Sequence, residues 1–165
     1  MPDPRGGRPW ADGDRRGDRA HHGADRRWLE RAIELSRRCP PSRTAFSVGA
    51  VLVDAAGREI ATGYSREGDP TEHAEEAALR KAGTVAPGTT SYSSMEPCGA
   101  RKSRPRPCAA LIRDAGIVRV VYALREPALF VDGEGDELLR TAGVEVVEIT
   151  DLADAVRQVN AHLPL

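Results

Sequence analysis

Strand-like and helix-like segments alternate through most of this chain, and that alternation limits the possible folds more than any other feature. Short runs rich in Val, Ile, Thr and Tyr predict strands at residues 47–54, 59–64, 89–94, 118–123 and 144–149. Apolar residues at helical spacing predict helices at residues 73–83, from 106 or 107 to 115, 134–142 and 151–162. Such alternation predicts a layered α/β fold. The polar residues of 89–94 suggest that this strand has a partly solvated face.

The N-terminal region divides into two parts. Residues 1–25 are rich in Gly, Arg and Asp and nearly free of large aliphatic residues. We expect a disordered tail there, because the segment buries too little surface to offset its ordering entropy. Apolar residues from Trp28 to Leu35 recur at helical spacing, and Pro40–Pro41 should end that helix. The predicted organisation is a tail at 1–25 and one domain at 26–165.

Charge and cysteine content restrict the partners and the compartment. The net charge of −1 gives no general attraction to nucleic acid or to an anionic membrane, and aromatic residues at 4% provide few stacking platforms for bases. Three cysteines argue against a disulfide framework and favour a reducing, cytoplasmic location. No apolar run approaches the length of a membrane span, and the N-terminus lacks the apolar core of a signal peptide.

Three potential metal ligands stand beside predicted elements. His73 opens a helix, Cys98 follows a strand, and Cys108 comes ten positions after Cys98 near the start of another helix. Two thiolates and one imidazole suit zinc, and three protein ligands leave one tetrahedral position open for water. Each residue alone could instead be a capping histidine or a buried cysteine. Because all three occur together in this order, we predict that His73, Cys98 and Cys108 bind Zn²⁺.

Glu75 is the predicted catalytic residue. Zinc makes hydroxide available near neutral pH, and a neighbouring carboxylate can take the water proton and pass it to a leaving amine. Residues i and i+2 lie on different sides of a regular helix, so His73 and Glu75 can face one ion only if the helix points its N-terminus at it. Glu75 could alternatively be a first-turn carboxylate favoured by the helix dipole. H-x-E followed by P-C-x-x-C is the zinc deaminase signature, although nine residues rather than two separate the cysteines here.

The stretch from Phe46 to Ile149 resembles the pyrimidine deaminase domain of riboflavin biosynthesis, the RibD-like branch of the cytidine deaminase-like superfamily. The motifs that carry this resemblance are SVGAVLVD, TGYSRE, EHAEEAAL, SMEPC, the long interval to PCAALI, and AGIVRVVYALREP. The GYSRE stretch and the Arg and Ser residues between the cysteines are most similar to the fungal-type variant. The resemblance implies a three-layer cytidine deaminase-like fold, with a mixed central sheet of about five strands and helices on both faces. It also implies a homodimer.

The resemblance further implies hydrolytic deamination of an aminopyrimidine. The best candidate substrate is the diaminopyrimidinone ribitylamino or ribosylamino 5′-phosphate of riboflavin biosynthesis, and the order of deamination and reduction stays open. The basic loop between the cysteines would suit a substrate phosphate, although it could equally be a solvated loop. The candidate substrate-binding residues are Arg66, Glu67, Arg101, Lys102 and Ser103.

Three other functions compete with this hypothesis. The chain could deaminate another small molecule, such as a nucleobase, a nucleoside or a specialised metabolite. A nucleic-acid editing deaminase is disfavoured by the charge and the low aromatic content. A non-catalytic zinc module is disfavoured by Glu75, because a purely structural site needs no proton shuttle.

Overall fold

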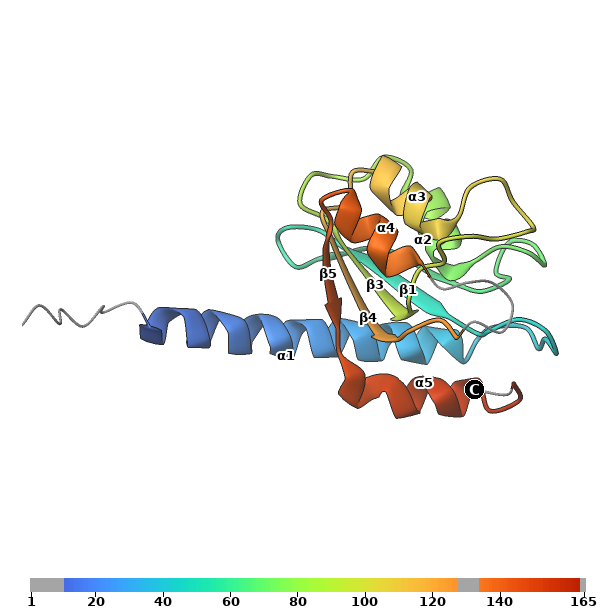
Figure 1. Cartoon of the computed structure of the whole chain (residues 1–165), viewed down its shortest axis with the longest axis horizontal. Helices are drawn as coiled ribbons and strands as arrows, with labels where there is room; N and C mark the ends of the chain where they lie inside the picture. The colour runs from blue at the N-terminus through green and yellow to red at the C-terminus, as the bar shows by residue number, and fades with distance from the viewer. Residues whose placement is uncertain (1–10, 128–133, 164–165) are drawn as a thin grey trace, which may run out of the picture.

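A five-stranded mixed sheet forms the centre of the computed structural model, which describes residues 11–127 and 134–163 (Figure 1). The strands are β1 (Gly49–Val53), β2 (Glu59–Tyr64), β3 (Thr90–Met95), β4 (Arg119–Leu124) and β5 (Glu145–Glu148). Their order is β2-β1-β3-β4-β5. β1 pairs antiparallel with β2 and β3, whereas the β3–β4 and β4–β5 pairs are parallel. The predicted α/β fold with a mixed sheet is confirmed.

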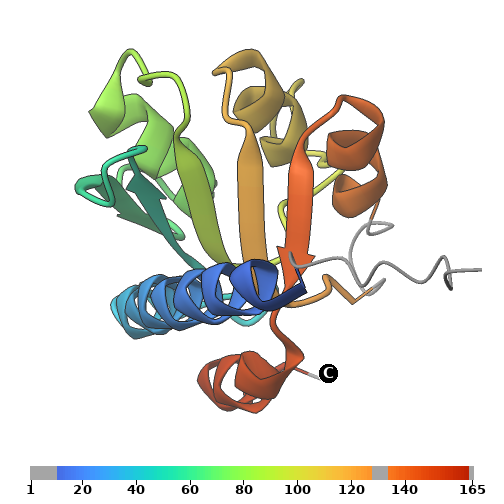
Figure 2. The ribbon, with the colours of Figure 1, turned by 90° about the vertical axis from the view of Figure 1, so that its left-hand side faces the viewer.

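Helices cover both faces of this sheet and complete three layers (Figure 2). One face carries α1 (Ala11–Ser36) and α5 (Ala153–Val159), which follows a short 3₁₀ helix, η1 (Thr150–Leu152). The other face carries α2 (Ala74–Ala82), α3 (Cys108–Asp114) and α4 (Gly135–Thr141). β1 is buried throughout: Val51 packs into the core beneath α1 and α5, and Leu52 packs into the core beneath α2, α3 and α4. No described helix is both long and apolar enough to cross a membrane.

The first helix begins earlier than the sequence predicts. α1 starts at Ala11, so much of the region expected to be a tail is helical. Asp25 explains why the helix packs before Arg26, since this residue is only 4% exposed. Its carboxylate accepts one hydrogen bond from Tyr92 at 2.8 Å and two from Arg119, each at 2.7 Å. Burial opposes the charge on Asp25, but the bonds from Arg119 and Tyr92 outweigh it and lower the pKa. Residues 1–10 of the expected tail lie outside the described residues.

The prediction of a partly solvated face on β3 was wrong. Ser91, Ser93 and Ser94 are all fully buried. Two of these hydroxyls have interior partners: Ser94 Oγ accepts the Gly49 N–H at 3.0 Å, and Ser93 Oγ donates to the Glu75 carboxylate at 2.6 Å. A strand can bury serines where other segments satisfy their hydroxyls. β3 therefore uses a polar residue to place the predicted catalytic carboxylate.

Candidate active site

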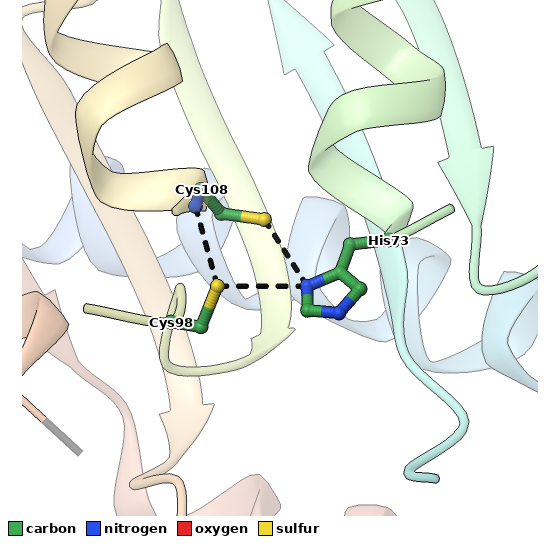
Figure 3. Close-up of side chains that lie close together, drawn as sticks. All are labelled: His73, Cys98 and Cys108. Atoms are coloured by element: carbon green, nitrogen blue, oxygen red, sulfur yellow. Dashed lines mark hydrogen bonds between the residues drawn. The ribbon is translucent and has the colours of Figure 1, made fainter. Parts of the chain in front are cut away.

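Three side chains from distant parts of the sequence converge beside β3 (Figure 3). His73 immediately precedes α2, Cys98 lies in the loop after β3, and Cys108 is the first residue of α3. His73 Nδ1 lies 3.5 Å from Cys98 Sγ and 3.3 Å from Cys108 Sγ. The ligand atoms of all three lie within 4.8 Å of one another, a spacing that could hold a metal ion. One imidazole and two sulfurs are also a donor set that zinc prefers.

Helix α2 begins in a way that lets His73 and Glu75 face the same place. His73 is the N-cap residue, with extended backbone angles of φ −87° and ψ 160°, and its N–H donates to the Glu76 carboxylate at 3.2 Å. Glu75 lies in the first helical turn. The helix thus presents its N-terminal end to the cluster, which is the arrangement that the i, i+2 spacing demands.

The two cysteines are held together by local hydrogen bonds. The backbone N–H of Cys108 donates to Cys98 Sγ at 3.2 Å, and the N–H of Ala109 donates to the Cys98 carbonyl at 3.1 Å. A hydrogen bond from the Cys108 thiol lowers the pKa of Cys98, while the same bond and burial raise the pKa of Cys108. The first thiolate is therefore formed readily, and a metal would displace the proton that the second sulfur keeps.

Glu75 is buried against this cluster. Its side chain is 3% exposed, and Oε1 accepts the hydrogen bond from Ser93. Burial raises the pKa of Glu75, since the charged form loses its hydration. A carboxyl group whose pKa is moved toward neutrality can both accept and return a proton, which is the property that general acid–base catalysis requires.

His73, Glu75 and Cys98 line a cavity of about 500 Å³. The segment 42–48 and the segment 100–103 between the cysteines both contribute lining residues. Cavities of roughly 300–1,000 Å³ are typical of small-molecule sites. A heterocyclic substrate could therefore enter with one ring edge beside the cluster.

The basic loop is only partly available to a ligand. Arg101 lines the cavity, but its side chain is 3% exposed, and its guanidinium bonds to Glu76 at 3.3 Å and to the Thr71 carbonyl at 2.6 Å. Lys102 and Ser103 also line the cavity. Within the described part of the chain, Lys102 has no ion-pair partner. Of Arg101 and Lys102, the two loop cations predicted to bind the substrate, Lys102 is thus the one available to bind a phosphate.

The other two predicted substrate contacts differ in position. Arg66 lines the cavity, but its guanidinium bonds to backbone carbonyls of the segment 40–47. Glu67 forms an ion pair with Lys81 at 2.7 Å and does not line the cavity. Glu67 therefore supports the surface of α2 rather than the site.

Two acidic residues at the cavity carry features that the sequence analysis missed. Among the residues that the structure describes, Glu126 Oε2 has no hydrogen-bond partner although it is buried. Burial, with the charges of Cys98, Glu75 and Glu96, raises the pKa of Glu126 to about 8. The Glu96 carboxylate accepts the backbone N–H groups of Glu126 and Asp136, each at 3.3 Å. Neither residue carries a periodic or spacing signal. Each follows a buried strand and lies in a stretch that carries the family resemblance, SMEPC for Glu96 and AGIVRVVYALREP for Glu126, but neither signal indicates a role.

The segment around Cys98 also packs closely against the start of α4. A Cβ atom at Gly135 would overlap the carbonyl oxygen of Pro97, and a Cβ at Gly99 would lie 2.7 Å from backbone atoms of Glu134 and Gly135. Only glycine permits this approach of two backbones. The cysteine-bearing loop is therefore seated directly on the N-terminal end of α4.

A helix N-terminus that carries H-x-E, together with two cysteines from neighbouring segments on a three-layer α/β sheet, is the arrangement of the cytidine deaminase-like class. Residues 23–124 match the family model described as the cytidine and deoxycytidylate deaminase zinc-binding region. The chain belongs to this family. The predicted resemblance is confirmed at this level.

Curated relatives carry names from riboflavin biosynthesis. The diaminohydroxyphosphoribosylamino-pyrimidine deaminase of Schizosaccharomyces pombe is 39% identical over 144 residues, which cover 83% of this chain and 35% of the relative. The riboflavin biosynthesis protein RibD of Escherichia coli is 39% identical over 124 residues, which cover 74% of this chain and 33% of the relative. This chain thus spans about a third of the length of the relatives it matches.

Solved structures show the same fold. The Aspergillus oryzae Rib2 deaminase in complex with DARIPP has a TM-score of 0.75 and 25% identity, covering 82% of this chain and 89% of that one. Acinetobacter baumannii RibD has a TM-score of 0.71 and 34% identity, and the match covers 84% of this chain and 38% of that one. The expected three-layer deaminase fold is confirmed by these neighbours.

Proposed function

We propose that this chain catalyses the zinc-dependent hydrolytic deamination of an aminopyrimidine. The best candidate substrate is a diaminopyrimidinone that carries a ribitylamino or ribosylamino 5′-phosphate. The observation that carries the proposal is the convergence of His73, Cys98 and Cys108 beside the buried Glu75 at one cavity. The names of the relatives support the substrate class.

In this proposal His73 Nδ1 and the sulfurs of Cys98 and Cys108 hold Zn²⁺. The three residues fit the ion by donor type and by the 4.8 Å limit on their separation. Bound zinc supplies Lewis acidity, which makes water a nucleophile at neutral pH. The hydrogen bond from the Cys108 N–H to Cys98 Sγ orients one ligand before the metal arrives.

Glu75 moves the protons in this reaction. Its carboxylate takes one proton from the attacking water and delivers it to the ring nitrogen. It then takes the second proton, from the hydroxyl added to the ring carbon, and delivers it to the amine, which leaves as ammonia as the C=O bond forms. Ser93 holds Oε1 through a 2.6 Å hydrogen bond, which leaves Oε2 to face the reactants. Burial of Glu75 excludes bulk water that would otherwise compete for its proton.

The cavity offers one acceptor and one cation for recognition of the substrate. We propose that the unpartnered Glu126 Oε2 accepts an N–H group of the aminopyrimidine, because a buried acceptor gains most when a ligand supplies its missing donor. We propose that Lys102, with Ser103, binds the phosphate.

Lys102→Ala is expected to raise KM for the phosphorylated substrate by roughly ten- to a hundredfold, the loss typical of one charge-assisted hydrogen bond. The dephosphorylated substrate should respond less than about twofold, since it has no group for Lys102 to bind. Arg106→Ala is the matched control, because Arg106 lies on the same loop as Lys102, pairs with Asp114 of α3 and does not line the cavity. Steady-state kinetics on both substrates measure the effect, and equal losses on both would contradict the phosphate role.

An ammonia-release screen tests the proposed function itself. The zinc-loaded protein is assayed with flavin-pathway aminopyrimidine phosphates, nucleobases, nucleosides and cytidine nucleotides. We expect turnover of the aminopyrimidine phosphates to exceed that of the other classes. If only a nucleoside or a free base is turned over, the proposed substrate class is wrong. If no compound releases ammonia, the proposed function is wrong.

Three further proposals concern the setting of the reaction. We propose a cytoplasmic location, which the three free cysteines support because thiols stay reduced there. The charge and the aromatic content still favour a small-molecule substrate over nucleic acid. A homodimer remains a prediction from the family resemblance.

A further inference from the structure

Arg66 has an unusual backbone for a residue with a side chain. It follows β2, and its φ of 63° is the only positive value at a non-glycine position in the described ranges. Residues with a Cβ rarely adopt this left-handed region, and those that do gather at functional sites. The Arg66 N–H donates to the Glu72 carbonyl at 2.7 Å, so the turn between β2 and α2 holds the backbone in this conformation.

The Arg66 guanidinium is directed at a single chain segment. Nε and Nη2 donate to the Pro40 carbonyl at 3.0 and 2.7 Å, and Nη1 donates to the Phe46 carbonyl at 3.0 Å. Nη2 also donates to Ser47 Oγ at 3.1 Å. These four hydrogen bonds end on three neutral oxygens, all within residues 40–47. The planar fork of an arginine can bind several acceptors in this way, whereas a lysine ammonium cannot match the geometry.

The segment 40–47 has no helix or strand of its own, yet it forms one wall of the cavity. Ser42, Thr44, Ala45 and Phe46 all line the cavity there. Its C-terminal end is held by the fully buried Asn160, which accepts the Ser47 N–H at 2.7 Å and donates to the Ser47 carbonyl at 3.1 Å. Arg66 joins the first residue of the segment to its last two.

We propose that Arg66 is a positioning residue, which holds the segment 40–47 in the shape that receives the substrate. It acts through this wall rather than by contacting the substrate directly, the role that the sequence analysis offered for it. From this left-handed backbone the side chain reaches the carbonyls of Pro40 and Phe46. This inference rests on the proposed function for its kinetic consequence, but the structural consequence can be measured without turnover.

Two substitutions distinguish the contribution of the planar guanidinium geometry of Arg66 from that of its charge. Arg66→Lys keeps the charge and loses the fork, and Arg66→Asn tolerates the positive φ while losing both. Arg58→Lys is the matched control, since Arg58 follows the β1–β2 turn and pairs with Asp54. Hydrogen exchange of the backbone amides of 42–48 is measured in the full-length, zinc-loaded protein without substrate. Steady-state kinetics then compare a phosphorylated aminopyrimidine with its dephosphorylated counterpart.

Both Arg66 variants are expected to exchange the amides of 42–48 at least about tenfold faster than the wild type. KM should rise by about ten- to a hundredfold for both substrates alike, with a smaller change in kcat. Arg58→Lys should change neither quantity. If Arg66→Asn does not fold, Arg66→Lys alone decides the question.

Three results would overturn the proposal. These are unchanged exchange in 42–48, a KM increase confined to the phosphorylated substrate, or a fall in kcat at constant KM, which indicates only a smaller folded fraction. Wild-type protein that releases no ammonia would defeat the proposed function instead. The exchange measurement would still decide whether Arg66 holds the wall, so the two failures are distinguishable.

Discussion

Glu75→Gln is expected to keep zinc and the fold while it loses ammonia release by on the order of a hundred- to ten-thousandfold. The amide can still accept the hydrogen bond from Ser93, but it can neither take the water proton nor return it to the leaving nitrogen. Because Glu75 serves successive proton transfers, the loss should appear in kcat rather than in KM. Metal content, circular dichroism and steady-state kinetics measure the three properties separately.

Glu137→Gln is the matched control, because Glu137 is an exposed carboxylate in the first turn of another helix, α4. It should leave metal content and turnover at wild-type levels. A Glu75→Gln protein with full zinc and near-normal ammonia release would refute the proton-transfer role, even though the chain would still belong to the deaminase family.

Cys98→Ala and Cys108→Ala are each expected to reduce zinc from about one ion per chain to a small fraction, and to abolish turnover. Removing one of three ligands leaves an incomplete coordination shell, and metal binding is coupled to the ordering of its ligands. Each variant should also melt at a lower temperature than the zinc-loaded wild type, since it loses the stabilisation that a bound metal gives. Metal analysis and thermal denaturation in the presence and absence of a chelator measure both effects.

Cys39→Ala controls for the loss of a thiol as such. Cys39 donates to the Val48 carbonyl at 3.4 Å and lies outside the cluster, so its removal should leave the zinc content unchanged. Unaltered zinc in both the Cys98 and Cys108 variants would show that the ion, if present, binds elsewhere.

Much of the fold can be predicted from short-range patterns. The strand expected at 59–64 has the same bounds in the structure, and the predicted helices at the C-terminal end of the chain differ only at their ends. Side-chain periodicity reports which face of an element is buried, so it locates elements well. The convergence of His73 with the two cysteines was also expected, because H-x-E followed by Pro-Cys and a later Cys matches the zinc deaminase signature.

Long-range pairing explains what the sequence could not reveal. Asp25 looks like one acid in a charged tail until Arg119, 94 residues away, makes it a buried anchor. Arg101 looks like a ligand-binding cation until Glu76 and Thr71 engage it. Glu126 follows a strand without any pattern that marks an orphaned acceptor. In each case the role depends on a partner that composition and spacing do not identify.

The close approach of Gly135 to Pro97 bears on how this scaffold could diversify. Any side chain at position 135 would push on the residue that precedes Cys98, so a change made in α4 would be transmitted to a proposed metal ligand. Several side chains of the walls at 40–47 and 100–103 face no such overlap, because they line the cavity, namely Ser42, Thr44, Ala45, Lys102 and Ser103. Natural drift or directed evolution toward new amines could therefore proceed through these two walls, while the junction between α4 and the cysteine loop stays unchanged.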